Sequence, residues 1–99
     1  MSDFVKVVII KSPQEKKRFQ AIFTRENGKK KKVNFGSKGA STFIDGANQK
    51  VKDAYIARHR VRENWNDPIS PGALSRWIIW GDSNNVNKNI VAFKKKFNL

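Results

Sequence analysis

The 99-residue sequence contains no cysteine, one histidine and three prolines. Without cysteine there can be no disulfide framework, no cysteine-type zinc site and no thiol nucleophile, a composition typical of a reducing compartment. Long apolar runs are also missing, because the longest, such as those at residues 7–10 and 77–80, have four residues each and could not span a bilayer. The beginning has an acid at Asp3 and neither a basic n-region nor a long apolar h-region, so no signal peptide is expected. These absences predict a soluble intracellular protein of the cytoplasm or nucleus, with no membrane partner.

Acidic residues are scarce, since 8 Asp and Glu stand against 21 Lys and Arg and the formal net charge at pH 7 is +13. The excess is uneven. Residues 1–40 hold eleven basic and three acidic side chains, residues 41–70 five and four, and residues 71–99 five and one. Hydrophobic residues make up 38% of the chain, which is enough to fold despite the charge. The length fits a single domain over residues 1–99.

The first part of the chain favours β-structure, with extended runs at Phe4–Lys11, Arg18–Thr24 and Lys30–Phe35. Between the last two lies Asn27-Gly28, the strongest short signal for a hairpin with a two-residue type I′ loop. The register of such a loop pairs Thr24 with Lys31, Ile22 with Val33 and Gln20 with Phe35. Phe4–Lys11 is expected to pair with this hairpin, because an isolated two-stranded ribbon is marginal in water.

That register predicts two different faces on the hairpin. The expected core face carries Ile22, Val33 and Phe35. The other face carries Phe19, Ala21 and Phe23 beside Lys30, Lys32 and Asn34. On this second face, Phe19 and Phe23 are candidates for stacking on bases. Packing beneath the helices is the favoured interpretation.

Three helices are expected after the strands. The first runs from about Ala47 to Arg62, with Asp45 as its N-cap. It is predicted from the helical spacing of Val51, Ala54, Tyr55, Arg58 and Val61. The second, from Pro71 to Trp80, begins at a Ser70 N-cap, ends at Gly81 as C′ residue, and is apolar enough to be buried. The third spans about residues 85–98, with one apolar stripe formed by Val86, Ile90, Phe93 and Phe97. The class is therefore α+β, a small antiparallel sheet of two to three strands followed by about three helices.

No complete catalytic constellation is present, so a non-enzymatic protein without cofactor or metal is expected. His59, Glu63 and Asp67 could form a metal site of a nuclease, but the neighbouring arginines would repel a cation. An i,i+4 pair of His59 with Glu63 is the favoured reading. The stretch Gly36–Gly39 lacks the full phosphate-loop pattern and is expected to be a linker whose backbone amides can approach a phosphate.

The tryptophans at positions 65, 77 and 80 are expected to be structural, and Trp65 could plug the junction between helices. Arg76, beside Trp77, could pair with Asp67 or reach out to a ligand, and the sequence leaves both open.

Basic clusters are the most informative feature. Each cluster alone could be a solvated face, but together, with almost no acidic compensation in the front and tail, they favour a polyanionic partner. The expected nucleic-acid-binding residues are Lys16, Lys17, Arg18, Lys29, Lys30, Lys31, Lys32, Lys38, Arg58, Arg60, Arg62, Lys94, Lys95 and Lys96.

Two motifs carry a resemblance to a known group of proteins. They are Arg-His-x-x-x-Glu-x-Trp at residues 58–65 and Ser-Arg-Trp-Ile-x-Trp at residues 75–80. The segments Val33–Gly39 and Lys95–Asn98 carry the same resemblance. In these motifs and segments the sequence resembles small, uncharacterised basic proteins of large nucleocytoplasmic DNA viruses of algae and protists. The resemblance implies a viral origin and a place in the virion.

The leading hypothesis is a small viral protein that binds nucleic acid, DNA above all, through phosphate contacts and is packaged in the virion. The alternative is a minor capsid-associated protein that contacts acidic surfaces of other virion proteins.

Overall fold

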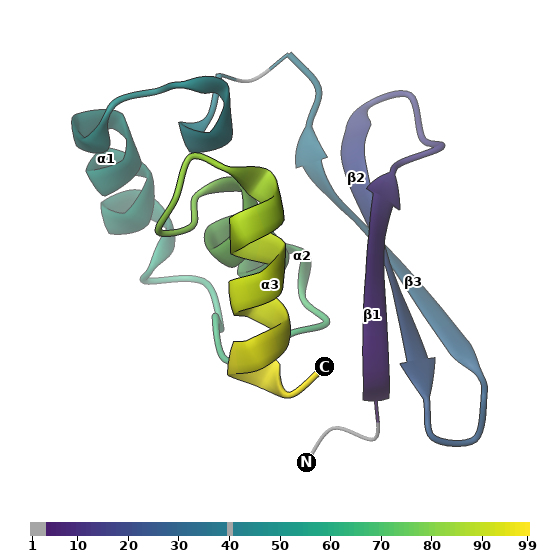
Figure 1. Ribbon diagram of the computed structural model, residues 1–99. Coiled ribbons are helices and arrows are strands. Elements are labelled where there is room, and N and C mark those ends of the chain that lie inside the picture. Colours follow the sequence, from purple (N-terminus) through teal and green to yellow (C-terminus); the bar gives the residue numbers. More distant parts are fainter. Residues whose placement is uncertain (1–3, 40) are drawn as a thin grey trace.

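The computed structural model describes residues 4–39 and 41–99. A three-stranded antiparallel sheet is followed by a layer of helices, which confirms the α+β class (Figure 1). The strands, in spatial order, are β1 (Phe4–Lys11), β2 (Lys17–Arg25) and β3 (Lys30–Ser37). The helical elements are η1 (Phe43–Asp45), α1 (Gln49–His59), α2 (Pro71–Leu74), η2 (Ser75–Ile79) and α3 (Val86–Phe97). No helix within the described ranges is both long and apolar enough to cross a membrane.

The β2–β3 hairpin exists, but its predicted register is wrong by one residue. Thr24 pairs with Lys30 rather than Lys31, because the loop has three residues, 26–28, instead of two. The Arg25 amide donates to the Lys29 carbonyl at 2.7 Å, and the Gly28 amide donates to the Arg25 carbonyl at 2.9 Å. Gly28 has a φ of 87°, whereas Asn27 does not adopt the positive φ that a type I′ turn requires. This is the three-residue loop that ends with a left-handed glycine.

The shift of one residue exchanges the two faces of the hairpin, since side chains alternate along a strand. Ala21 and Phe23 are buried, and Ile22, predicted to be in the core, lies on the opposite face. Val33 and Phe35 are buried as predicted, but they share the core face with Phe19, Ala21 and Phe23. The rings of Phe19 and Phe35 are in contact, with 5.6 Å between their centroids. The core interpretation of Phe19 and Phe23 is therefore confirmed.

All of the helices lie on this core side of the sheet and leave its other face uncovered (Figure 1). Leu74, Ile78, Ile79 and Phe93 meet the sheet residues in one buried cluster. β3 continues to Ser37, two residues beyond the predicted end, because Lys17 of β2 still pairs with Ser37. Gly36, expected in a linker, is therefore part of the strand.

Helix α1 is shorter than predicted and its N-cap is Asn48, whose side chain accepts a hydrogen bond from the Val51 amide at 3.0 Å. Asp45, the expected cap, belongs to η1. The predicted apolar stripe of α1 is largely exposed, and Val51 faces solvent. Lys52 is buried instead, because its Nζ donates to the Gly81 carbonyl at 2.7 Å and lies 4.6 Å from the centre of the Phe43 ring.

The second helix begins as predicted, with the Ser70 hydroxyl accepting from the Ala73 amide at 3.0 Å and Pro71 in the first position. After Leu74 it widens into the π-helical turn η2, and most of this segment is buried as expected. Gly81 follows, but for a different reason than predicted. It lacks the positive φ of a C′ glycine, and a Cβ there would overlap the Trp77 carbonyl and lie 2.6 Å from Asn89 Cγ.

Helix α3 matches its predicted stripe, since Phe93 is buried and Val86, Ile90 and Phe97 pack against the core. Asn85 caps its beginning by accepting from the Lys88 amide, and Asn98 ends it in a left-handed conformation with a φ of 56°.

Candidate nucleic-acid interface

Nine side chains lie in three cross-strand rows on the uncovered side of the sheet, here called the outer face, and Gln20 is the one of them that its neighbours bury. Alternation along the strands places these residues opposite the buried ones. The rows are Lys6, Thr24 and Lys30, then Val8, Ile22 and Lys32, then Ile10, Gln20 and Asn34. Three lysines and no carboxylate therefore share one flat surface.

The composition of the outer face divides it into a basic part and a polar part. Lys30 and Lys32 extend from the edge strand β3, and Lys6 extends from the opposite edge, β1. At the far end of the sheet, Asn34 Oδ1 accepts hydrogen bonds from Ser12 Oγ at 2.7 Å and from Gln20 Nε2 at 3.2 Å. This network fixes the side chains at the polar end, whereas the three lysines are exposed and free to follow a phosphate backbone.

The remaining hairpin lysines lie close to the outer face without belonging to it. Lys29 follows the loop, with its amide donating to Asn27 Oδ1 at 3.0 Å. Lys31 pairs with Phe23, so its side chain lies on the same side of the sheet as Phe23. Unlike Phe23, however, Lys31 is exposed to solvent. The hairpin therefore presents positive charge to both sides, as the alternation of Lys29–Lys32 predicts.

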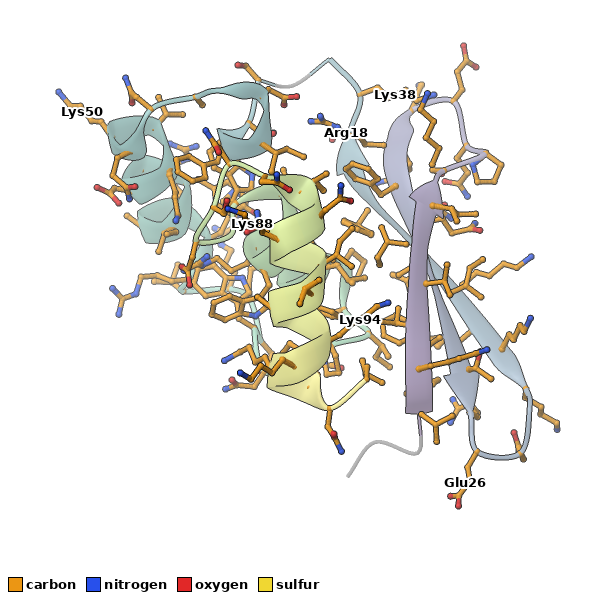
Figure 2. The ribbon with its side chains drawn as sticks, viewed as in Figure 1. Arg18, Glu26, Lys38, Lys50, Lys88 and Lys94 are labelled. Carbon is orange, nitrogen blue, oxygen red and sulfur yellow. The ribbon has the colours of Figure 1, made fainter. Side chains whose placement is uncertain are left out.

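A second group of predicted residues gathers at the other end of the sheet, where Figure 2 labels Arg18 and Lys38, opposite Glu26 in the hairpin loop. Lys16, Lys17 and Lys38 come together there, because the Lys38 amide donates to the Lys16 carbonyl at 3.3 Å and Lys17 pairs with Ser37. The sequence separates Lys38 from the others by more than twenty positions, and only the hairpin brings them together.

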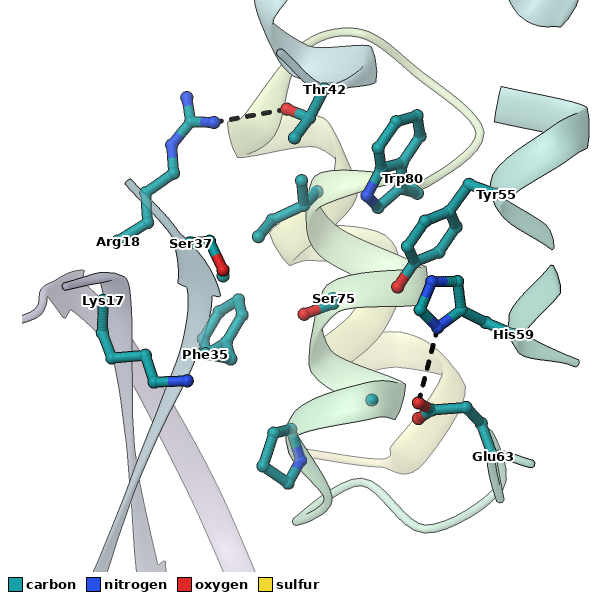
Figure 3. Close-up of a pocket in the computed structure, with 14 residues that line it drawn as sticks. Lys17, Arg18, Phe35, Ser37, Thr42, Tyr55, His59, Glu63, Ser75 and Trp80 are labelled. Carbon is teal, nitrogen blue, oxygen red and sulfur yellow. Dashed lines mark hydrogen bonds and ion pairs between the residues drawn. The ribbon is translucent and has the colours of Figure 1, made fainter. Parts of the chain in front are cut away.

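Arg18 belongs to this second group but is engaged within the chain. Its two terminal nitrogens donate to the two oxygens of Asp45 at 2.5 and 2.6 Å, and one of them also donates to Thr42 Oγ1 at 3.2 Å (Figure 3). Hydrogen bonding from Arg18 and then from Thr42 holds the pKa of the Asp45 carboxyl well below its usual range, despite the opposing effect of burial. Arg18 therefore joins β2 to η1 and has less charge to offer a partner than the neighbouring lysines.

The other predicted clusters lie on the helical layer. Arg58 and Arg60 lie at the end of α1, and Arg62 lies in the turn beyond it, on the side of the molecule away from the outer face (Figure 1). Lys94, Lys95 and Lys96 form the last turn of α3. The structure therefore does not bring all the predicted basic residues onto one surface.

The last of these lysines makes an internal contact. Lys96 Nζ lies 4.5 Å from the ring centre of Trp77, whose other neighbour is the Arg76 guanidinium at 4.4 Å. Arg76 donates to the Trp80 carbonyl at 2.8 Å and contacts the rings of Trp65 and Trp77, so it is a structural anchor. Its charge neighbour is Asp82, not the Asp67 considered from the sequence. Trp65 joins the helices as expected, since its carbonyl accepts from Trp77 Nε1 at 2.8 Å.

A cleft of about 420 Å³ opens between the ends of β2 and β3 and the helical layer (Figure 3). Its side toward the helices carries three stacked rings. Tyr55 lies between His59, at 4.3 Å between centroids, and Trp80, at 4.4 Å. His59 Nδ1 lies 3.7 Å from Glu63 Oε1, which is the predicted i,i+4 pair. Gly72 leaves room for this carboxylate, because a Cβ on Gly72 would overlap it.

Among the side chains that line the cleft, Tyr55 has a phenol whose pKa is raised well above its ordinary value. Burial, and then the nearby Glu63 carboxylate, raise the pKa of its phenol to about 12. Because this folded-state pKa lies above the ordinary value of about 10, the associated stability is present below pH 10 and is lost as the pH rises toward 12.

Tyr55 is the single tyrosine of the chain, so its ionisation can be followed by tyrosinate absorbance without overlap from other phenols. The native protein is expected to titrate near pH 12, and the protein in concentrated urea near pH 10. Tyr55→Phe provides the blank. A native midpoint near 10 would contradict the burial of this phenol.

The residues considered for a nuclease are only partly assembled. His59 and Glu63 are close, but Asp67 lies in the following turn, where its Oδ1 accepts from the Ile69 amide at 3.2 Å. Within residues 4–39 and 41–99, no group of three or more His, Asp or Glu side chains is arranged to hold a metal ion.

Lys6 is the functional candidate that sequence reasoning missed. The pairing of Phe4–Lys11 with the hairpin was expected, but both faces of this strand are apolar, so the alternation did not reveal which residues face outward. The register with β2, which places Lys6 opposite Thr24, supplies that information.

The described residues thus define a small α+β protein with one uncovered basic sheet face and a separate cleft lined by both polar and apolar side chains. Residues 7–59, which span the sheet, η1 and α1, match the model of a family of unknown function (DUF5754), and the chain belongs to that family. An uncharacterised protein of Acanthamoeba polyphaga mimivirus is 34% identical over 84 residues, covering 79% of this chain and 84% of the mimivirus protein. The match confirms the resemblance to uncharacterised proteins of large DNA viruses and supports a viral origin. No solved structure matches the chain.

Proposed function

We propose that this protein binds nucleic acid, with DNA as the expected polymer, through phosphate contacts of the outer face. The observation that carries the proposal is the set of exposed lysines at positions 6, 30 and 32, which share an uncovered surface with no carboxylate among its nine residues. Lysines on a flat sheet can neutralise successive phosphates without reading bases, because phosphate contacts carry no sequence information. Lys29 and Lys31 extend the positive charge around the adjacent hairpin end.

Electrostatics of the whole chain support the same partner. The net charge of +13 attracts a polyanion over distances longer than individual contacts. The apolar residues of the outer face are aliphatic, since its aromatic neighbours Phe19 and Phe23 point into the core. Base stacking on this surface is therefore not part of the proposal, and binding is expected to depend little on sequence.

The proposal is tested by the salt dependence of binding to random-sequence duplex DNA. If the five lysines at positions 6 and 29–32 contact phosphates, log K against log salt concentration should have a slope of about −4 to −5. Replacing Lys6, Lys30 and Lys32 with glutamine in one triple variant should make the slope less negative by about 3, because each lost phosphate contact removes about one unit. Fluorescence anisotropy of labelled DNA over a range of salt concentrations measures both slopes.

A matched control removes the same amount of charge elsewhere. Replacing Arg58, Arg60 and Arg62 with glutamine lowers the net charge equally, but on the far side of the helical layer (Figure 1). This variant should keep most of the slope. Equal effects of the two triple variants would show that only net charge matters, and absence of binding at low salt would overturn the proposal.

A second candidate function is favoured by the two apolar side chains that β1 exposes on the outer face. Val8 and Ile10 are 45% and 41% exposed and lie next to each other on an edge strand. Such a patch beside lysines also suits an acidic surface of another virion protein. In that case the recombinant protein should not bind DNA, and the protein in purified virus particles should fractionate with the shell. Its confinement to the genome-containing core would contradict this candidate.

A further inference from the structure

The cleft beside the sheet is distinct from the outer face and has its own chemistry. Its side toward the sheet is formed by Lys17 at the beginning of β2 and by Gly36 and Ser37 at the end of β3. Ser75 and Tyr55 line it from the helical layer. Figure 3 shows the hydroxyls of Ser37 and Ser75 in the space between β3 and the α2–η2 segment, with the Tyr55 hydroxyl directed toward that segment.

The polar groups of the cleft are mostly hydrogen-bond donors without a partner in the described part of the chain. Lys17 Nζ and the hydroxyls of Ser37, Tyr55 and Ser75 take part in none of the side-chain hydrogen bonds found among the described residues. Glu63 is the carboxylate of the lining, and its Oε1 lies 3.7 Å from His59 Nδ1. Arg18, the other cation of the lining, is bound to Asp45. Lys17 is therefore the cation of this cleft that is available to a ligand.

The cleft is larger than an inorganic ion needs, and part of its lining is apolar, so an ion alone would not fill it. Its volume of about 420 Å³ lies within the range of small-molecule sites. Phe35, Pro71, Ile79 and Trp80 line it along with the polar groups, so an organic body can contact these side chains while an anionic end meets the donors. A phosphate group suits such donors, because its oxygens accept several hydrogen bonds and pair with an ammonium.

We propose that this cleft binds a phosphate monoester of nucleotide size, with Lys17 and the hydroxyls of Ser37, Ser75 and Tyr55 around the phosphate. Two sources present this same chemistry, a free nucleoside monophosphate and the 5′-phosphate at the end of a nucleic-acid strand. The Tyr55 phenol is protonated at neutral pH, as any phenol with a pKa of about 10 or more is, and it can therefore donate a hydrogen bond. The cleft does not depend on the outer face, and its ligand can bind whether or not that face binds DNA.

Two probes test the site directly, adenosine 5′-monophosphate and adenosine, each titrated into the 15N-labelled full chain. The monophosphate should bind at least about tenfold more tightly than adenosine, because a charge-assisted contact accounts for such a factor. Its chemical-shift changes should centre on Ser37, Tyr55 and Ser75. Equal affinities, or shift changes confined to the outer face, would overturn the proposal.

Variants of the cleft separate the site from general electrostatics. Lys17→Gln and Ser75→Ala should each weaken binding of the monophosphate, Lys17→Gln by about tenfold. Lys16→Gln is the matched control, since it removes the same charge one residue away and does not line the cleft. Equal losses in Lys16→Gln and Lys17→Gln would contradict a built site.

A pair of oligonucleotides distinguishes the two sources. If a 5′-phosphorylated strand binds more tightly than its 5′-hydroxyl counterpart, and Lys17→Gln removes the difference, the strand end is the ligand. If the two strands bind equally while the free monophosphate still binds, the ligand is a free nucleotide. Failure of the cleft proposal would leave the salt-dependent binding of duplex DNA unchanged, and loss of that binding in the Lys6, Lys30 and Lys32 variant would leave the monophosphate affinity unchanged.

Discussion

Replacing Phe23 with alanine is expected to lower the free energy of unfolding by about 3–5 kcal/mol, the range for truncating a large buried aromatic side chain. Phe23 has no exposed surface, lies between β1 and β3 in the central strand, and has its ring 5.3 Å from that of Phe4. The surrounding side chains come from both the sheet and the helices, so they cannot readily collapse into the space left behind. Urea unfolding followed by tryptophan fluorescence measures the change.

The neighbouring substitution Ile22→Ala is the matched control. Ile22 lies on the outer face beside Val8 and Lys32 and keeps part of its surface in water, so its truncation should cost about 1 kcal/mol or less. The two-residue loop predicted from Asn27-Gly28 would reverse this order, because it places Ile22 in the core. A larger loss for Ile22→Ala than for Phe23→Ala would therefore contradict the three-residue loop.

The hairpin shows where sequence reasoning reaches its limit. Asn27-Gly28 correctly located the turn, but this dipeptide is compatible with two loops. It suits a two-residue type I′ turn, and it suits equally a three-residue loop that ends in glycine. Alternation could not decide between them, since Ala21, Ile22 and Phe23 are all apolar and either register buries a hydrophobic set. The decision depends on the helical layer, which covers Phe23 and leaves Ile22 open.

The helices were predicted well where their caps are local and poorly where a distant partner decides. Ser70 and Pro71 lie where the cap rules place them, because a cap bonds within its own first turn, whereas the N-cap of α1 is Asn48 and not the predicted Asp45. Lys52 is the opposite case. Its burial depends on the Gly81 carbonyl, 29 positions away, and helical periodicity therefore assigned the inner side of α1 to the wrong residues.

For the candidate site, the sequence predicts a polyanionic partner but does not predict which surface would bind it. The clusters at residues 29–32 and 94–96 are basic wherever they lie, but side-chain partners decide what is available. Arg18 is bound to Asp45 and Lys96 lies over Trp77, while Lys6, isolated in the sequence, shares an exposed face with Lys30 and Lys32. Cross-strand register and ion pairing, rather than charge density along the chain, select the outer face.

Asn89 carries the second large expected effect on stability. Although polar, this side chain is 2% exposed and lies on α3 where the helix meets the turn after η2. Its Nδ2 donates to the carbonyls of Ile78 at 2.9 Å and Ser83 at 2.6 Å, and its Oδ1 accepts from the Ser83 amide at 3.1 Å. One side chain thus satisfies the Ile78 carbonyl near the end of η2 and both backbone groups of Ser83 in the turn that follows.

Asn89→Ala should lower the free energy of unfolding by about 3 kcal/mol or more, because it leaves buried backbone groups without partners and opens space beside Gly81. Asn89→Asp should cost at least as much, since a carboxylate would face the two carbonyls to which the amide now donates. Asn87→Ala, an exposed site on the same helix, should change stability by less than about 0.5 kcal/mol. If Asn89→Ala unfolds at the same urea concentration as Asn87→Ala, the amide does not hold the turn, and the packing of α3 alone must fix the position of η2.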